Sequence, residues 1–288
     1  MDRSSQSLAF IVDFDGTITT KDTISALADF GIAFQKSKGV ELTEAWQDAV
    51  ARYGEDYSRH IKSYKPITEE RKTLVEVVAH LRSLKNIELS SFGRVGACRI
   101  FKAIGNDDWR RFGRGAVARS EVEVTDGFRG FVAQVHRSGG LLGIVSVNFS
   151  REFIRGVLEA SAESNMVEIL ANQPDEKGTL LGPKGTVLAT SDAKLAAMKQ
   201  LLHAWKEGSN REEPSFKVVY VGDSAVDIEC LTAKEVLGIV ISADGKSGLM
   251  DTLRRININI THISKYGEGW SSSVYWARDF KELCEALF

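Results

Sequence analysis

The sequence predicts an α/β protein with a doubly wound, mainly parallel sheet and an all-helical insert after its first strand. From residue 128 onward, helical patterns alternate with short runs of aliphatic and β-branched residues, which is typical of strand–helix–strand units. One such run already occurs at residues 10–12, but about a hundred residues of helical periodicity follow it. The first strand therefore belongs with the later α/β part, and the helical block interrupts a single domain.

The first predicted strand ends in two aspartates and a glycine. Asp13 and Asp15 are two residues apart, so both side chains leave a strand-like backbone on the same side, and Gly16 allows a sharp turn. Two carboxylates this close repel each other unless a cation, a shared proton or nearby donors stabilise them. Mg²⁺, which prefers oxygen ligands, would do so. The alternative is that the pair only caps the strand and begins a turn.

The helical insert is expected to form a cap over residues 23–122, and residues 1–22 and 123–288 to form the core. Pro66 separates two of its predicted helices, because proline stops a helix. The apolar stripes are formed by Leu42, Ala45, Trp46, Ala49, Val50 and Tyr53, by Leu74, Val77, Val78, Leu81 and Leu84, and by Ala97, Ile100, Phe101 and Ile104.

The second part of the chain supplies the remaining core elements. We expect strands at 141–147, 167–171, 217–221 and 236–241, and helices at 128–137, 150–160 and 191–206. The run at 141–147 is apolar enough to be buried on both faces, as strands of parallel sheets are. Residues 178–187 predict a hairpin with a Gly-Pro turn.

Polar residues follow three of the predicted strands. Asp13 and Asp15 end the first, Ser146 ends the second, and Asp223 follows the strand at 217–221. In an open α/β sheet, ligands bind in the crevice beyond the carboxyl ends of the strands. We therefore expect these side chains to meet in one site.

Two further groups indicate a bound anion. Ser146 and Asn148 precede a predicted helix, whose free N–H groups and dipole favour phosphate, although Ser146 could simply complete a turn and Ser150 cap the helix. Lys194 lies in the first turn of another helix, where the dipole disfavours a cation, so it indicates an anion to neutralise or else a solvated surface lysine.

Asp227 lies four residues after Asp223 at the start of a helix, where single acids are common. Together with Asp13 and Asp15, these residues would bring four carboxylates into one crevice. Such crowding requires a metal ion and a lysine.

Composition limits the partner. With 37 basic and 39 acidic residues, the net charge of −2 gives no bulk electrostatic reason to bind nucleic acid or an anionic membrane. Three distant cysteines, no signal-peptide core and no long apolar run predict a cytoplasmic protein. The arginines between Arg110 and Arg119 are better explained as a solvated helix face, and the aromatics of 266–276 as packing groups.

Four segments, taken together, resemble the motifs of the haloacid dehalogenase superfamily of phosphohydrolases. They are DFDGT at 13–17, Ser146 after an apolar strand, Lys194 at a helix start, and GDSAVD at 222–227. The resemblance implies a Rossmann-like core and a phosphatase that acts on a small phosphorylated metabolite. The superfamily's dehalogenase branch lacks the second aspartate, which is Asp15 here.

The resemblance also implies a role for each motif residue. Asp13 would be the nucleophile that forms an aspartyl-phosphate, and Asp15 the general acid and then base. Ser146 and Lys194 would bind phosphate, with Asn148 beside them. Mg²⁺ would be held by Asp13, Asp223 and the backbone carbonyl of Asp15, and Asp227 would support the metal or orient Lys194.

The insert resembles the caps of phosphoserine-phosphatase-like members, but two positions differ. Those enzymes carry a glutamate nine residues after the nucleophile, where this chain has Asp22, and a Ser-Gly-Gly segment where it has Ser146, Val147 and Asn148. Thiamine monophosphate phosphatases and other small-metabolite phosphatases therefore remain open. Asp22 and Thr23 are the expected substrate-side residues, with a helix N-cap as the alternative.

Two other functions stay open from the sequence. A phosphotransferase or mutase of the same superfamily would keep the motifs and pass the phosphoryl group to another alcohol. A non-catalytic binding protein would keep the fold, but it would have no need of Asp13, Asp15, Lys194 and Asp223 together.

Overall fold

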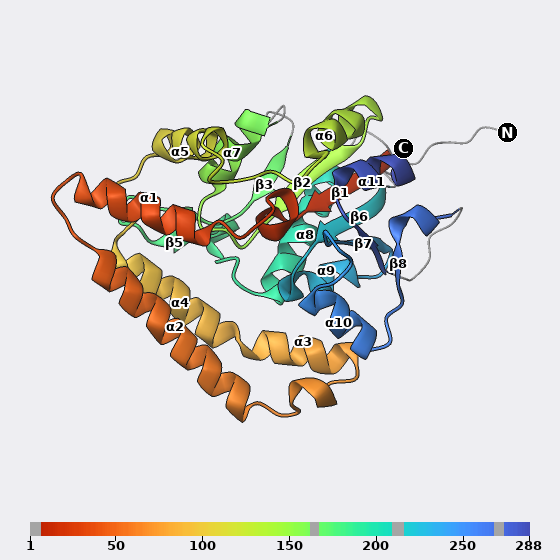
Figure 1. Ribbon diagram of the computed structural model, residues 1–288, viewed down its shortest axis with the longest axis horizontal. Coiled ribbons are helices and arrows are strands. Elements are labelled where there is room, and N and C mark those ends of the chain that lie inside the picture. Colours follow the sequence, from red (N-terminus) through yellow and green to blue (C-terminus); the bar gives the residue numbers. More distant parts are fainter. Residues whose placement is uncertain (1–6, 162–166, 209–215, 268–273) are drawn as a thin grey trace.

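In the computed structural model, which describes residues 7–161, 167–208, 216–267 and 274–288, a central parallel sheet carries the fold (Figure 1). The sheet has seven strands within these ranges, in the order β3-β2-β1-β6-β7-β9-β8, and all neighbours pair in parallel. The strands are β1 (Ser7–Val12), β2 (Leu141–Val145), β3 (Glu168–Leu170), β6 (Phe216–Gly222), β7 (Val236–Ile241), β8 (Ile260–His262) and β9 (Val274–Ala277). The predicted α/β class is confirmed.

The sheet is buried on both faces because its strands alternate between two apolar clusters. In β1, Phe10 and Val12 face one cluster, while Ala9 and Ile11 face the other. Helices α6 and α11 contribute Phe131 and Phe280 to the first cluster, and α8 contributes Leu201 to the second. The core helices are α6 (Phe128–Arg137), α7 (Arg151–Ser161), α8 (Ser191–Glu207), α9 (Ile228–Leu231), α10 (Gly248–Arg255) and α11 (Phe280–Leu287).

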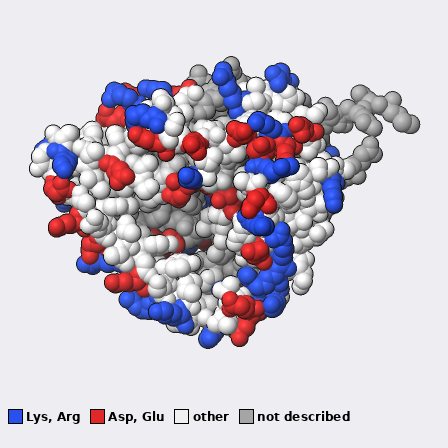
Figure 2. All heavy atoms as spheres, in the orientation of Figure 1, with Lys and Arg blue, Asp and Glu red and all other residues white. Residues whose placement is uncertain are grey.

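The insert is helical, as predicted. Its helices are α1 (Ile24–Lys36), α2 (Thr43–Ser63), α3 (Leu74–Ser83), α4 (Lys85–Cys98) and α5 (Asn106–Ala118), with a short turn at Thr68–Glu70. Helices α2 and α4 lie side by side, and the surface between α1 and α4 is hollowed (Figures 1 and 2). Thr19 and Val124 form an antiparallel bridge, so the chain enters and leaves the insert at neighbouring points.

The prediction that the third apolar stripe, at 97–104, lies on a helix is wrong. Helix α4 ends at Cys98, and Arg99 adopts a left-handed conformation with φ 58°. Ile100, Phe101 and Ile104 are nevertheless buried in the first cluster. Tertiary burial, and not helical periodicity, therefore explains why these positions are apolar.

The predicted hairpin exists but its place was wrong. Strands β4 (Gln173–Pro174) and β5 (Leu180–Leu181) pair antiparallel, and Gly178 closes the turn between them with φ 88°. The Gly-Pro pair at 182–183 instead begins a separate short turn after β5. The hairpin turns at Gly178 because this position requires a positive φ, which glycine adopts without strain.

The sequence interpretation missed β8 and β9 at the edge of the sheet. The aromatic segment at 266–276 was expected to be a packing loop, but its end forms β9. There the Trp276 ring packs edge-on against His262, with 4.5 Å between centroids. Trp270, also expected to pack against the sheet, lies outside the described residues.

No helix in the described ranges is both long enough and apolar enough to cross a membrane.

The arginines of the cluster at Arg110–Arg119 form ion pairs with acidic residues. Arg110 lies 2.6 Å from Glu152 of α7, Arg114 pairs with Glu159 of α7, and Arg119 lies 2.7 Å from Glu121. The first two pairs join α5 to α7. Arg110 and Arg114 therefore hold α5 against α7, whereas the sequence predicted only a solvated helix face.

Helices α5 and α7 cross at two glycines. A Cβ on Gly156 would lie 2.3 Å from the Arg110 carbonyl oxygen, and one on Gly113 would lie 2.5 Å from the Phe153 carbonyl oxygen. Both distances are far below van der Waals contact. The backbones can approach this closely only because neither residue carries a side chain.

Gly156→Ala should therefore force the two helices apart, and we expect it to lower the free energy of unfolding by about 1–3 kcal/mol. Gly130→Ala in α6 is the matched control, because a Cβ there meets nothing within 4 Å. It should be neutral or stabilising by up to about 1 kcal/mol, since alanine favours a helix. Urea unfolding followed by circular dichroism compares the two, and equal stabilities would refute a tight crossing.

Candidate active site

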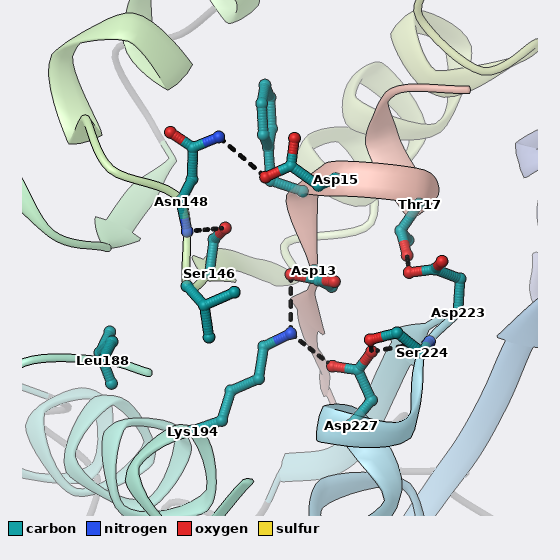
Figure 3. A network of polar contacts seen from close by, with 12 residues as sticks. Asp13, Asp15, Thr17, Ser146, Asn148, Leu188, Lys194, Asp223, Ser224 and Asp227 are labelled. Atoms are coloured by element: carbon teal, nitrogen blue, oxygen red, sulfur yellow. Dashed lines mark hydrogen bonds and ion pairs between the residues drawn. The ribbon is translucent and has the colours of Figure 1, made fainter. Parts of the chain in front are cut away.

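The polar residues predicted at the strand ends meet at the carboxyl edge of the sheet (Figure 3). Asp13 directly follows β1, Ser146 directly follows β2, and Asp223 directly follows β6. The Asp13 N–H donates to the Val221 carbonyl oxygen at 2.8 Å, which continues the ladder between β1 and β6 into the site. The parallel arrangement of these strands is thus what gathers residues that lie far apart in the chain.

A tight turn at Phe14–Ile18 carries the chain away from Asp13. Gly16 in this turn has φ 73°, and a Cβ there would lie 2.3 Å from a carboxylate oxygen of Asp223. The Thr17 hydroxyl donates to Asp223 Oδ1 at 3.0 Å. Glycine at position 16 therefore serves both the backbone conformation and the close approach of Asp223.

Lys194 occupies the centre of the site and is completely buried. Its Nζ lies 2.8 Å from Asp13 Oδ1 and 2.6 Å from Asp227 Oδ1. Burial alone would lower the pKa of Lys194, but the carboxylates of Asp13 and Asp227 raise it above its ordinary value. The lysine is therefore a fixed positive charge, and the alternative of a solvated surface lysine is wrong.

Asp227 is also completely buried, and several donors fix its carboxylate. Its Oδ1 accepts the Tyr220 hydroxyl at 2.6 Å as well as Lys194. Its Oδ2 accepts the backbone N–H and the hydroxyl of Ser224, at 3.1 and 2.9 Å. These contacts orient the carboxylate toward Lys194.

Among the described residues, Asp13, Asp223 and Asp227 offer carboxylate oxygens that all lie within 4.8 Å of one another. Burial raises the pKa of Asp13 well above its ordinary value, with Lys194 opposing the rise and the other two carboxylates adding to it. Burial, together with Asp227, also raises the pKa of Asp223 to about 7. Within this cluster Lys194 balances only one negative charge, so the oxygens fit a hard divalent cation such as Mg²⁺.

Asp15 turns toward the cap side of the site. Its Oδ1 accepts the backbone N–H and the hydroxyl of Thr23, at 2.9 and 2.6 Å, and its Oδ2 accepts the Asn148 side-chain amide at 2.8 Å. Burial raises the pKa of Asp15 to about 6, although these hydrogen bonds oppose the rise. Both protonation states are accessible near neutral pH, as an acid–base group requires.

Ser146 and Asn148 lie at the turn between β2 and α7. The Ser146 hydroxyl oxygen accepts the Asn148 N–H at 3.0 Å, and Asn148 Oδ1 accepts the Ser150 N–H at 3.0 Å. The Asn148 amide also donates to the Thr23 hydroxyl at 3.0 Å. Asn148 thus closes the turn before α7 and holds Asp15, and the Ser150 hydroxyl caps the helix by accepting the Phe153 N–H at 3.1 Å. Phosphate binding by Ser146 or Asn148 stays a prediction.

The two expected substrate-side residues separate in the structure. Thr23 is buried and directed at Asp15, whereas Asp22 is exposed and accepts the Ile24 N–H at 2.8 Å. The N-cap of α1 is Thr23, whose side chain makes no capping hydrogen bond, and Asp22 lies one residue before this position. Asp22 also lines a cavity between the cap and the core.

Sequence reasoning missed several residues that complete the site. Ser224 precedes Asp227 by three positions, the spacing of a capping box, and this pattern could have identified it. Thr17 belongs to the first motif, but the sequence pattern assigns no role to its hydroxyl, which donates to Asp223. Tyr220 lies inside a buried strand, where an apolar sequence context gave no signal for its hydrogen bond to Asp227.

The fold and the site define an α/β protein with a buried lysine inside a carboxylate cluster at the carboxyl edge of a parallel sheet. The chain belongs to the haloacid dehalogenase-like hydrolase family, whose model matches residues 10–232. This match confirms the family resemblance predicted from the four motifs.

Individual relatives are distant. The chain is 24% identical over 247 residues to Cold tolerance protein 1 of Saccharomyces cerevisiae, which covers 80% of this chain and 77% of that protein. A functionally unknown protein of Anaerococcus prevotii shares the fold with a TM-score of 0.51 and 15% identity, covering 88% of this chain and 83% of the other. A phosphoserine phosphatase in apo form gives a TM-score of 0.49 and 15% identity, covering 98% of this chain and 100% of the other.

Proposed function

We propose that this protein is a Mg²⁺-dependent phosphatase that hydrolyses a small phosphorylated metabolite through an aspartyl-phosphate on Asp13. The observation that carries the proposal is the contact of Lys194 Nζ with Asp13 at 2.8 Å, in a family of hydrolases. A buried cation beside a carboxylate at this edge suits a transferring phosphoryl group, whose negative charge needs neutralising.

Each residue of the site would have its own role in the reaction. The free oxygen of Asp13 would attack phosphorus, while Lys194 would hold the phosphoryl oxygens, with the Ser146 hydroxyl as a further donor. Asp15 would give its proton to the leaving alcohol oxygen and then take one from the hydrolytic water. Thr23 and Asn148 would keep the Asp15 carboxyl aimed at that oxygen, and Asp227 would position Lys194.

The carboxylate cluster fits Mg²⁺. Asp13, Asp223 and the backbone carbonyl of Asp15 would hold the ion, with Asp227 as a supporting group. When bound, Mg²⁺ supplies charge neutralisation to the phosphoryl group.

The test of this function is phosphate release from a broad panel of phosphorylated metabolites and a generic aryl phosphate, with Mg²⁺ or with EDTA. Metal-dependent release from at least one compound is expected. Release that requires an added alcohol acceptor would favour a phosphotransferase, and no release from any compound would favour a non-catalytic binding protein.

Asp223→Asn tests the metal site separately. The change removes one charge and keeps the shape, so we expect the Mg²⁺ concentration for half-maximal activity to rise at least about tenfold. The Thr17 hydroxyl can still donate to the amide oxygen, which limits structural damage. A Mg²⁺ titration of activity measures the shift, and a curve that matches the wild type would remove Asp223 from the metal site.

A further inference from the structure

A cavity of about 440 Å³ lies between the cap and the catalytic edge. It is lined by residues of α2 and α4, by Asp22 before α1, and by the core residues Val147 and Val226. Val147 and Val226 are sequence neighbours of Ser146 and Asp227, so the cavity adjoins the phosphate end of the site. Its volume is that of a site for a small molecule.

The cavity wall is mostly apolar, and four of its residues are aromatic. Trp46 and Tyr53 come from α2, Phe92 comes from α4, and Phe149 comes from the turn after β2. Phe92 and Phe149 meet edge to face with 5.2 Å between ring centroids. Aromatic rings placed on several sides favour a flat, apolar group, and their faces also attract cations.

The charged groups of the wall are acidic. Glu88 of α4 is half-buried and its Oε1 accepts the Tyr53 hydroxyl at 3.0 Å, while Asp22 lies nearer the core. Burial raises the pKa of Glu88, and a cation bound beside the carboxylate would lower this pKa again. Among the described residues, no lysine or arginine lines this cavity or forms an ion pair with either carboxylate.

We propose that the leaving alcohol of the substrate carries a planar aromatic ring with a positive charge and no negative charge. The inference rests on the proposed phosphatase function and names its substrate class. The ring would stack among Trp46, Phe92 and Phe149, and its cation would pair with Glu88 and Asp22. An anionic leaving group would instead meet two carboxylates and, within the part of the chain that the structure describes, no lysine or arginine.

Three benzyl phosphates that differ only in a tetrahedral para substituent test the charge. They carry trimethylammonio, tert-butyl or sulfonate groups, which are similar in shape and positive, neutral or negative. We expect kcat/KM for the cationic ester to exceed that of the tert-butyl ester about tenfold, and the sulfonate ester to be the poorest substrate. p-Nitrophenyl phosphate reports whether the enzyme is catalytically competent.

Glu88→Gln should reduce the ratio of cationic to neutral kcat/KM to about threefold or less, because one carboxylate loses its charge. Asp22→Asn is a second variant with the same expectation. Glu55→Gln, on an exposed position of α2, is the matched control and should keep the wild-type ratio. The ratio within each variant cancels any general loss of active protein.

The outcomes separate the two proposals. If p-nitrophenyl phosphate and all three benzyl esters are inert, the phosphatase function fails and the substrate class fails with it. If the esters are hydrolysed but the neutral or anionic one is equal or better, the function stands and the cationic leaving group is refuted. A cationic preference that survives both acid-to-amide changes would also refute the assigned carboxylates.

Discussion

Asp13→Asn should lower turnover by more than about a thousandfold while the protein keeps its fold, because the amide is a far weaker nucleophile than the carboxylate. The side chain keeps its shape, and Lys194 keeps Asp227 as a partner at 2.6 Å. Phosphate release and circular dichroism measure the two effects. Near-wild-type turnover by the folded variant would refute Asp13 as the nucleophile.

The same role can be tested without relying on a dead variant. The Asp15→Asn variant lacks the acid–base group, but p-nitrophenyl phosphate has a leaving group that needs no proton. Transfer of its phosphoryl group to Asp13 should therefore proceed, while hydrolysis of the phosphoenzyme stalls for want of a base. We expect a burst of nitrophenolate, and borohydride reduction of the trapped acyl phosphate should convert Asp13 to homoserine, detectable by mass spectrometry. A burst with the label on another residue would contradict the assignment.

Lys194→Met should lower both activity and stability. The change leaves the side chain nearly as long but removes the charge that lies between Asp13 and Asp227, so buried carboxylates lose their partner. Breaking a buried ion pair in this way costs about 3–5 kcal/mol of folding free energy. Urea unfolding in EDTA measures the loss, and phosphate release in Mg²⁺ should fall by at least about a hundredfold.

Two control variants separate the role of Lys194 in phosphate binding from its role in balancing charge. Lys199→Met makes the same chemical change on an exposed position of α8 and should leave both stability and activity near wild type. The double variant Lys194→Met/Asp227→Asn should recover part of the stability, because one repelling charge is gone, but none of the activity. Recovery of activity in the double variant would show that Lys194 only balances charge and does not bind phosphate.

Much of the fold could be predicted because local patterns and tertiary structure agree. The strand at 236–241 and the helix at 128–137 have the predicted bounds, since buried strands and amphipathic helices leave clear periodicities. The stripe at 97–104 failed because apolar residues are also required where an irregular segment is buried. Strand β9, which pairs with β7 and with the edge strand β8, was missed because it has four residues in an aromatic and glycine-rich context.

The sequence by itself determined the chemistry of the site: which carboxylates, lysine and hydroxyl groups stand at strand ends and helix starts. Only the tertiary structure decided how they are used, because contacts such as those of Asn148 and Thr23 with Asp15 join residues more than a hundred positions apart or across the cap boundary. The acid-lined aromatic cavity likewise exists only where α2 and α4 meet the core. Spacing along one chain segment records local geometry, whereas such contacts depend on the packing of several segments at once.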